Sequence, residues 1–337
     1  MKNKSLKKER DISIQILRVC ACFMVFIVHF GQRVGFGGFL RELTEFGKYG
    51  VQLFFLISGF LVGKTFYNNP NISIKEYYKK RIITILPLYY IVIIYYFITE
   101  NILNHYLNVI PVDHLGVGWF RYLFLLNGFL NSDTYFWSNL GITWTIPVFC
   151  FFYLVAPLVL RKVKTVFSSL IIWGAVFIAT KIAGIYYPCV IFSNIQLLFL
   201  GVVLFYCVNK KVYRESIIAF LMIAIGMTII GNSTYVYVSL FSCIILILVT
   251  MKEINLPGCF KKIINVLDKY SYTLYLMHGV IFCSILDRLN LFGVSKITIG
   301  LIAIVGTFLS TLIVGKFIEK PIQKKLTKKF IGDKIKK

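Results

Sequence analysis

Asp-Ile-Ser-Ile-Gln-Ile-Leu-Arg-Val-Cys-Ala-Cys-Phe-Met-Val-Phe-Ile-Val-His-Phe, residues 11–30, is the stretch that decides the fold of this chain. It is long enough to cross a bilayer as a helix, yet it carries Arg18 and His29. Because ionisable side chains are costly to bury in a membrane, both are candidate functional groups. At about 100° per residue, His29 returns to within about 20° of Arg18 and lies about 16 Å further along, so both share one helix face. Alternatively, Arg18 reaches one membrane surface while His29 lies in the opposite interface.

The composition extends this interpretation to the whole chain. Of its 337 residues 58% are hydrophobic, and apolar runs recur from end to end. A soluble core cannot use that much apolar sequence, so we predict an all-α polytopic membrane protein. No polar block or Gly/Ser/Pro-rich linker is large enough to mark a second unit, so residues 1–337 are expected to form one membrane-embedded domain. The first span has no small-residue cleavage site after it and is expected to be retained.

Ten apolar stretches, most of them close to twenty residues, are candidate membrane helices. They are residues 12–30, 47–64, 82–99, 142–160, 167–187, 190–208, 216–231, 234–250, 271–289 and 297–317. The apolar stretch 118–130 is too short to span a bilayer. We therefore expect residues 100–141 to form one outer segment, with 118–130 re-entrant or lying in the interface.

The charge distribution predicts the orientation of the chain. It has 37 Lys and Arg against 14 Asp and Glu, a formal net charge of +23. A soluble protein with this charge would suggest nucleic acid as a partner, but here the basic residues gather in the loops of one side, so no nucleic-acid partner is expected. The positive-inside rule predicts a plasma or inner membrane protein with both termini cytoplasmic, including a basic tail, residues 318–337, against anionic membrane lipids. The eight cysteines have no metal or disulfide spacing, and we expect neither a metal nor a permanently bound cofactor.

Histidine is the candidate catalytic group of the spans. No carboxylate lies in the middle of a predicted span, which disfavours a proton-coupled transporter, whereas His29 and His278 lie in the first and ninth spans. A neutral imidazole can accept a hydroxyl proton, so a membrane-embedded His is a plausible general base for acyl transfer. Arg18 could bind a donor phosphate. Together these groups suggest a donor from the cytoplasm and an acceptor from the other side.

The outer segment contains side chains suited to a sugar acceptor. They are His114, Trp119, Arg121 and Asp133. Such a mixture can stack on sugar rings and hydrogen-bond to hydroxyls. An aromatic belt at the level of the lipid headgroups explains the aromatic members equally well, so the two interpretations stay open.

Several motifs in fixed order resemble the acyltransferase-3 family of membrane O-acyltransferases. They are Arg18 and His29 with ten residues between them, Gly-Val-Gln-Leu-Phe-Phe-Leu-Ile-Ser-Gly-Phe at 50–60, Arg81 followed by Pro-Leu-Tyr-Tyr at 87–90, Tyr-Ser-Tyr-Thr-Leu-Tyr-Leu-Met-His at 270–278 and Glu-Lys-Pro at 319–321. The resemblance implies transfer of an acyl group, commonly acetyl, from cytoplasmic acyl-CoA to a hydroxyl of an extracytoplasmic polysaccharide or lipid-linked sugar. It implies that His29 is catalytic and that Arg18 and Arg81 serve the donor. Further motif positions, whose roles stay open, are Ser58, Gly59, Trp144, Tyr153, Tyr275 and His278. For Ser58, Gly59, Tyr275 and His278, packing or pore lining is favoured at least as much as a chemical role.

Two departures from the family pattern leave other functions open. Phe149 stands where many members have a glutamate, and Thr84 replaces an arginine. They indicate a divergent member, a different donor or an inactive relative, and we favour the first because Arg18 and His29 are intact. The alternatives to an enzyme are a flippase for polysaccharide or lipid-linked glycan, and a scaffold among glycan-assembly partners.

Overall fold

The computed structural model describes residues 11–99, 118–129, 138–251, 254, 256–285, 293 and 295–332. Within these residues every regular element is a helix, and eight helical stretches are long and apolar enough to cross a membrane. This confirms the predicted all-α polytopic membrane fold. The number of ten spans stays a prediction, because the helix over the seventh has only 17 residues and the ninth is described only in part.

The α-helices follow one another along the chain. They are α1 (Ile12–Val34), α2 (Gly38–Glu45), α3 (Gly50–Asn68), α4 (Ile74–Ile98), α6 (Gly118–Leu123), α7 (Thr145–Val159), α8 (Val166–Tyr186), α9 (Val190–Asn209), α10 (Tyr213–Ile229), α11 (Ser233–Thr250), α12 (Gly258–Lys269), α13 (Ser271–Met277), α15 (Lys296–Val314) and α16 (Lys320–Ile331). Short 3₁₀ segments are η1 (Phe46–Tyr49), η3 (Leu126–Phe129), η4 (Ser138–Trp144) and η5 (Leu160–Lys162). The segments η6 (His278–Cys283) and η8 (Gly315–Glu319) are π-helical.

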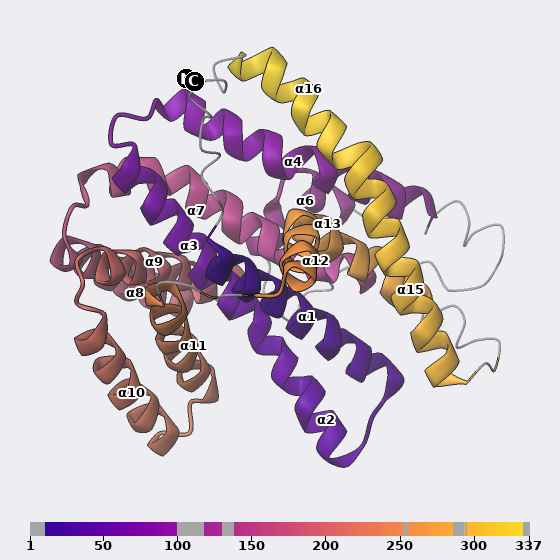
Figure 1. Ribbon diagram of the computed structural model, residues 1–337, viewed down its shortest axis with the longest axis horizontal. Coiled ribbons are helices and arrows are strands. Elements are labelled where there is room, and N and C mark those ends of the chain that lie inside the picture. The colour runs from indigo at the N-terminus through magenta and orange to yellow at the C-terminus, as the bar shows by residue number, and fades with distance from the viewer. Residues whose placement is uncertain are drawn as a thin grey trace.

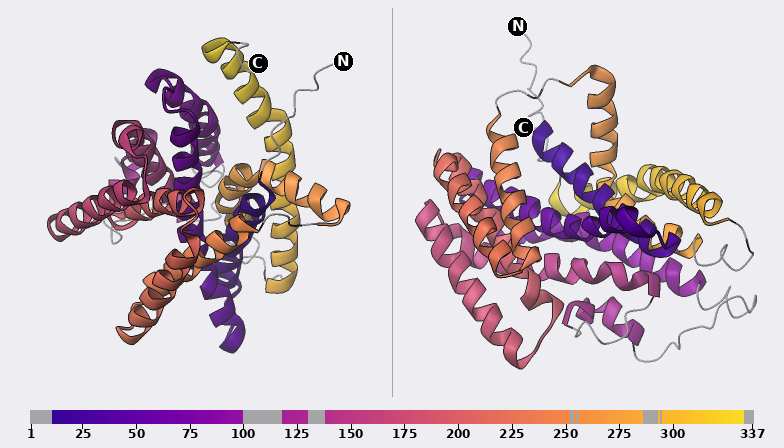
Figure 2. Two further views of the ribbon diagram at one scale, coloured as in Figure 1. Left: turned by 60° about the vertical axis from the view of Figure 1, so that its left-hand side comes forward. Right: turned by 90° about the horizontal axis from the view of Figure 1, so that it is seen from below.

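Helix α1 lies in the middle of the bundle, where it packs against α3, α12 and α13 (Figure 1). Helices α8 to α11 gather on one side of it, and α15 and α16 lie on the other (Figure 1). Two further views keep these groups apart (Figure 2). The chain thus surrounds the helix that carries Arg18 and His29 with segments from all parts of the sequence.

Local signals explain where α1 begins and ends. The Asp11 side chain accepts a hydrogen bond from the Ser13 backbone N–H, which satisfies a free donor of the first turn. Gly35 ends the helix in the left-handed region at φ 74°, which glycine adopts without a steric penalty. The helix therefore runs four residues beyond the predicted end at residue 30.

Two other helices extend beyond the predicted spans. Helix α4 begins at Ile74, eight residues before the span predicted from residue 82, so Arg81 lies on a helix. The tail predicted over 318–337 continues the last span as η8 and α16 as far as Ile331, and α16 packs along α4. Both extensions are rich in charged residues, so the apolar pattern stops before the helix does. A search for apolar spans therefore does not predict them.

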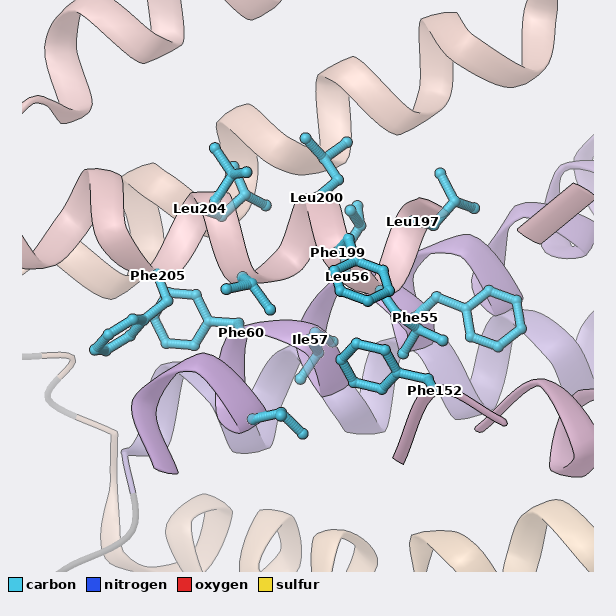
Figure 3. Packing of buried hydrophobic residues seen from close by; sticks show 14 of the residues in the cluster. Phe55, Leu56, Ile57, Phe60, Phe152, Leu197, Phe199, Leu200, Leu204 and Phe205 are labelled. Carbon is cyan, nitrogen blue, oxygen red and sulfur yellow. The ribbon is translucent and has the colours of Figure 1, made fainter. Parts of the chain in front are cut away.

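The tightest packing joins α3 to α9. Phe60, Phe199 and Phe205 lie in the buried cluster between these helices (Figure 3). Gly59 and Gly201 face each other there, and an added Cβ on either would overlap the backbone of the opposite helix at Leu198 or Leu56. Small residues at a membrane helix contact let the backbones approach closely. Gly59 is therefore a packing residue, one of the two roles left open for it.

Candidate active site

A cavity of about 210 Å³ lies where α1, α3, α4, α7 and α13 meet. Five of the predicted site residues line it, namely Arg18, Ser58, Arg81, Tyr153 and Tyr275. Thr84 and Phe149, the two departures from the family pattern, line the same cavity. Residues that are far apart in the sequence are thus brought together around one space.

Arg18 is held at this cavity by a carboxylate of α12. Its guanidinium lies 2.8 Å from Oδ1 of Asp268, whose side chain is fully buried. The Gln15 amide donates to the other carboxylate oxygen at 3.2 Å and to Asn265 Oδ1 at 2.8 Å. No role was expected for Asp268 from the sequence, because it lies between predicted spans. Its position two residues before the Tyr270 motif is the signal that could have found it.

Arg81 stands between this cavity and a second one. Its guanidinium carbon lies 4.7 Å from the ring centre of Tyr153 and 5.3 Å from that of Tyr77, distances typical of cation–π contacts. The second cavity has a volume of about 510 Å³ and a mostly polar wall from the α3–α4 connection and the first turns of α4. Arg81 and Thr84 line both cavities. The two spaces therefore adjoin at these two residues.

Basic segments converge around the second cavity. Lys80 lines its wall and pairs with Glu76 at 2.7 Å. Arg161, after α7, donates to the backbone oxygen of Ile72 in that wall. Lys79 donates to the backbone oxygen of Phe330 on α16 at 2.8 Å. Three basic segments, the start of α4, η5 directly after α7, and α16, thus lie close to the second cavity. All three were expected on the same side of the membrane.

His29 pairs with His278. The two imidazole rings stack with centroids 5.3 Å apart. His278 is only 2% exposed, and its Nδ1–H donates to the backbone oxygen of Tyr275. Its Nε2 is buried and has no hydrogen-bond partner among the described residues. This nitrogen is therefore an acceptor of the kind that a proton transfer needs.

Tyr275 joins the histidine pair to the cavity. Its ring lies 5.3 Å from that of His278, and its hydroxyl donates to Ile142 O at 2.6 Å and shares a 2.8 Å hydrogen bond with Thr145. The π-helix η6 begins at His278, and such segments are frequent at functional sites. The arginine cavity and the histidines are thus neighbouring parts of one site.

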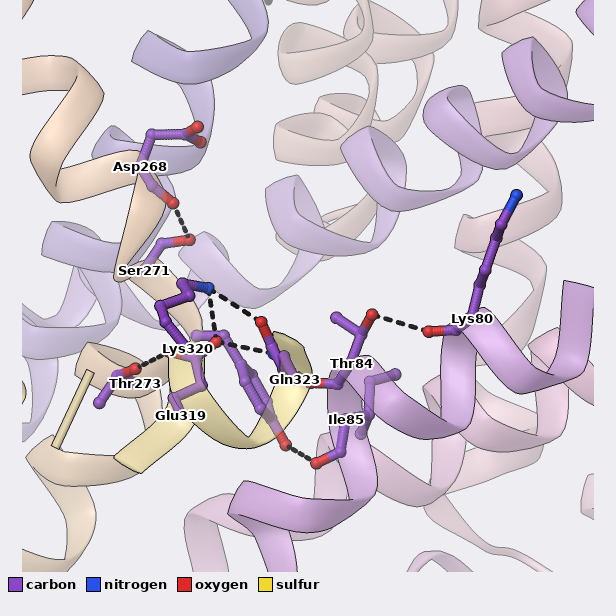
Figure 4. Close-up of polar contacts among 10 residues, drawn as sticks. Lys80, Thr84, Ile85, Asp268, Ser271, Thr273, Glu319, Lys320 and Gln323 are labelled. Carbon is purple, nitrogen blue, oxygen red and sulfur yellow. Dashed lines mark hydrogen bonds and ion pairs between the residues drawn. The ribbon is translucent and has the colours of Figure 1, made fainter. Parts of the chain in front are cut away.

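A polar network around Glu319 reaches Thr84, a residue that lines both cavities (Figure 4). Glu319 is 4% exposed and accepts from Thr273 on α13 and from Lys320 at 2.8 Å. Gln323 donates to the same carboxylate at 2.9 Å and to the backbone oxygen of Thr84 at 3.1 Å. The Glu-Lys-Pro motif therefore ties α13 and α16 to the residue of α4 that lies between the two cavities.

The other motif positions have packing contacts. Trp144 lies edge-on to Phe55, with ring centroids 6.0 Å apart. Phe149 packs against Phe55 at 5.0 Å and stacks on Tyr153 at 6.2 Å. An aromatic ring thus occupies the position where many family members have a carboxylate.

The structure describes the predicted acceptor side only in part. Arg121 is exposed on α6. The hydroxyls of Tyr89 and Tyr90 on α4 donate hydrogen bonds to backbone oxygens of the last two residues of α6 and so hold the two helices together. His114, Asp133 and the side chain of Trp119 lie outside the described residues. Among the described residues, no three His, Cys, Asp or Glu side chains form a cluster that could hold a metal ion.

Comparison with known proteins identifies the family of this chain. The model of the acyltransferase domain of the acyltransferase-3 family matches residues 11–316, which is most of the chain. No curated protein and no solved structure matches. The match begins with the first residue of the Arg18 and His29 segment and extends into the π-helical turn before Glu319. This chain belongs to the acyltransferase-3 family of membrane acyltransferases.

Proposed function

We propose that this protein transfers an acyl group, most simply acetyl, from acyl-CoA to a hydroxyl of an extracytoplasmic polysaccharide or lipid-linked sugar. The observation that carries the proposal is the pair of adjoining cavities, which share Arg81 and Thr84. The outer cavity has Lys80 in its wall, and the inner one has Tyr275, whose ring neighbours the histidine pair. The basic side faces the cytoplasm of the plasma or inner membrane in this proposal, in agreement with the positive-inside rule.

The two cavities suit the two parts of acyl-CoA. The outer cavity, about 510 Å³ with Lys80 and Arg81 in its wall, takes the nucleotide phosphates. Arginine binds phosphate through paired, charge-assisted hydrogen bonds. The inner cavity, about 210 Å³, takes the slender pantetheine arm and points the thioester towards Tyr275 and the histidines. Arg18 interacts with a polar part of that arm.

The chemistry follows from the histidine pair. His29 takes the proton of the acceptor hydroxyl as its oxygen attacks the thioester carbonyl. The C–S bond then breaks, the ester forms, and the CoA thiolate takes a proton from the imidazolium. Positioning of both substrates in one water-poor site supplies a further part of the rate.

The variant Arg81→Gln is expected to raise the KM for acetyl-CoA about 10- to 100-fold, because a hydrogen bond to a charged group contributes about 1.5–3 kcal/mol. Release of CoA from acetyl-CoA in membrane vesicles measures it. The matched control is Arg214→Gln, an exposed arginine at the start of α10. An unchanged KM in Arg81→Gln would remove Arg81 from the donor site.

Mass spectrometry and proton NMR of surface glycans test the proposal as a whole. The comparison is between cells with the intact protein and cells that lack it. An ester present only with the intact protein supports acyl transfer and identifies both the acyl group and the acceptor. If the amount of glycan falls while its acylation is unchanged, the protein is a transporter or an assembly scaffold.

A further inference from the structure

We propose that Asp268 is the positioning residue of this site, a carboxylate that holds the Arg18 guanidinium at the cavity in place of the glutamate absent at position 149. The inference rests on the proposed function, because the role of Arg18 is defined by the acyl donor. Asp268 lines neither cavity and acts through Arg18, which lines the inner one.

The geometry of the pair is that of a built contact. The two side chains meet at 2.8 Å, and the exposed fraction is 27% for the Arg18 side chain and zero for that of Asp268. A buried carboxylate is costly unless it is paired and hydrogen-bonded. Arg18 also lines the cavity. The ion pair with Asp268 therefore engages one side of the Arg18 side chain, while the remaining exposed part still faces the cavity.

Neighbouring groups fix the carboxylate itself. Gln15, nearly one turn before Arg18 on α1, donates to Oδ2, so both oxygens of Asp268 have a partner on α1. On the other side, the hydroxyl of Ser271 donates to the backbone oxygen of Asp268 at 3.0 Å. Because Ser271 also lines the cavity, α12, α13 and α1 are held in one arrangement around Arg18.

Position 149 offers a place to which the charge can be moved. Phe149 and Arg18 line the same cavity, and the Phe149 ring stacks on Tyr153, whose ring also lies against Arg81. A carboxylate at position 149 would therefore enter the cavity that contains both arginines. If the site needs the negative charge of Asp268, a glutamate at position 149 should supply part of that charge when Asp268 is changed to Asn.

The experiment measures the binding and turnover of acetyl-CoA by the full-length protein. Asp268→Asn is expected to raise the Kd for acetyl-CoA about tenfold or more, because the charge-assisted contact that orients Arg18 is weakened. In the Arg18→Gln background the same change should alter the Kd less than about twofold, which identifies a role exerted through Arg18. An unchanged Kd in Asp268→Asn, or an equal rise in both backgrounds, would overturn the proposal.

Three further variants keep the result interpretable. Asp268→Glu retains the charge and should bind acetyl-CoA more tightly than Asp268→Asn. The double variant that combines Asp268→Asn with Phe149→Glu should regain part of the affinity for acetyl-CoA that Asp268→Asn loses. If neither Asp268→Glu nor the double variant binds acetyl-CoA more tightly than Asp268→Asn, the positioning role is contradicted. The matched control is Glu215→Gln, an exposed carboxylate on α10. If the unchanged protein binds no acetyl-CoA, both the proposed function and this inference are wrong. If it binds acetyl-CoA and Asp268→Asn binds it with the same Kd, the inference alone is overturned.

Discussion

The variant His29→Ala is expected to lose acyl transfer by about 10²- to 10⁴-fold, the usual contribution of general acid–base catalysis. His29 lies on the central helix and stacks on His278, beside the tyrosine that lines the donor cavity. Without its imidazole, the acceptor hydroxyl has to attack the thioester while it keeps its proton. The content of glycan ester and the rate of CoA release both measure the loss.

Controls separate this loss from a loss of protein. The amount of membrane-inserted protein should be unchanged, and Cys20→Ala, which truncates an exposed side chain of the same helix, should retain activity. His278→Asn keeps a side-chain N–H for the Tyr275 carbonyl and is expected to lose less activity than His29→Ala. Retained acylation in His29→Ala would disprove this assignment, and a greater loss in His278→Asn would make His278 the base.

The second large effect is expected in the core, where Gly59→Ala should lower the free energy of unfolding by about 1–3 kcal/mol or more. The new methyl group would overlap the Leu198 backbone on α9, and neither backbone can move without separating α3 from α9. The buried phenylalanines beside the contact would then lose close packing (Figure 3). Thermal unfolding of the detergent-purified protein measures the change.

Glycines in open surroundings provide the matched control. An added Cβ at Gly174 on α8 or Gly226 on α10 meets nothing within 4 Å. Both Gly→Ala variants should keep or slightly raise stability, because alanine is the better helix former. If Gly59→Ala unfolds at the same temperature as Gly174→Ala, the close approach of α3 and α9 contributes little to stability.

The sequence predicted the helical membrane fold well because apolar runs report burial in lipid directly. It predicted the helix ends less well, since the charged first turns of α4 and all of α16 continue helices beyond the apolar pattern. The motifs also pointed to residues that the fold brings together, with Arg18, Arg81 and Tyr275 at one cavity.

The contacts of two buried carboxylates could not be predicted from the sequence. Asp268 and Glu319 lie outside the apolar cores of the spans, and hydropathy gives no information on which helix they approach. The sequence shows only that Phe149 stands where many family members have a glutamate. That a carboxylate of α12 reaches Arg18 depends on how the helices pack, and the pattern of apolar residues gives no information on this.

The ion pair between α1 and α12 also has a consequence for biosynthesis. Gln15 and Asp268, which meet in the same cluster as Arg18, are 253 residues apart in the chain. At about 5–20 residues per second, the ribosome completes Asp268 roughly 10 to 50 s after it has made the first helix. An arginine at the centre of a membrane helix costs about 2.5–3.5 kcal/mol on insertion, and Arg18, the seventh of the 23 residues of α1, costs less because it lies nearer the helix end. During this interval the apolar residues of the first helix offset that cost without Asp268. A nascent chain that stops before α12 therefore lacks the carboxylate that pairs with Arg18 in the complete fold.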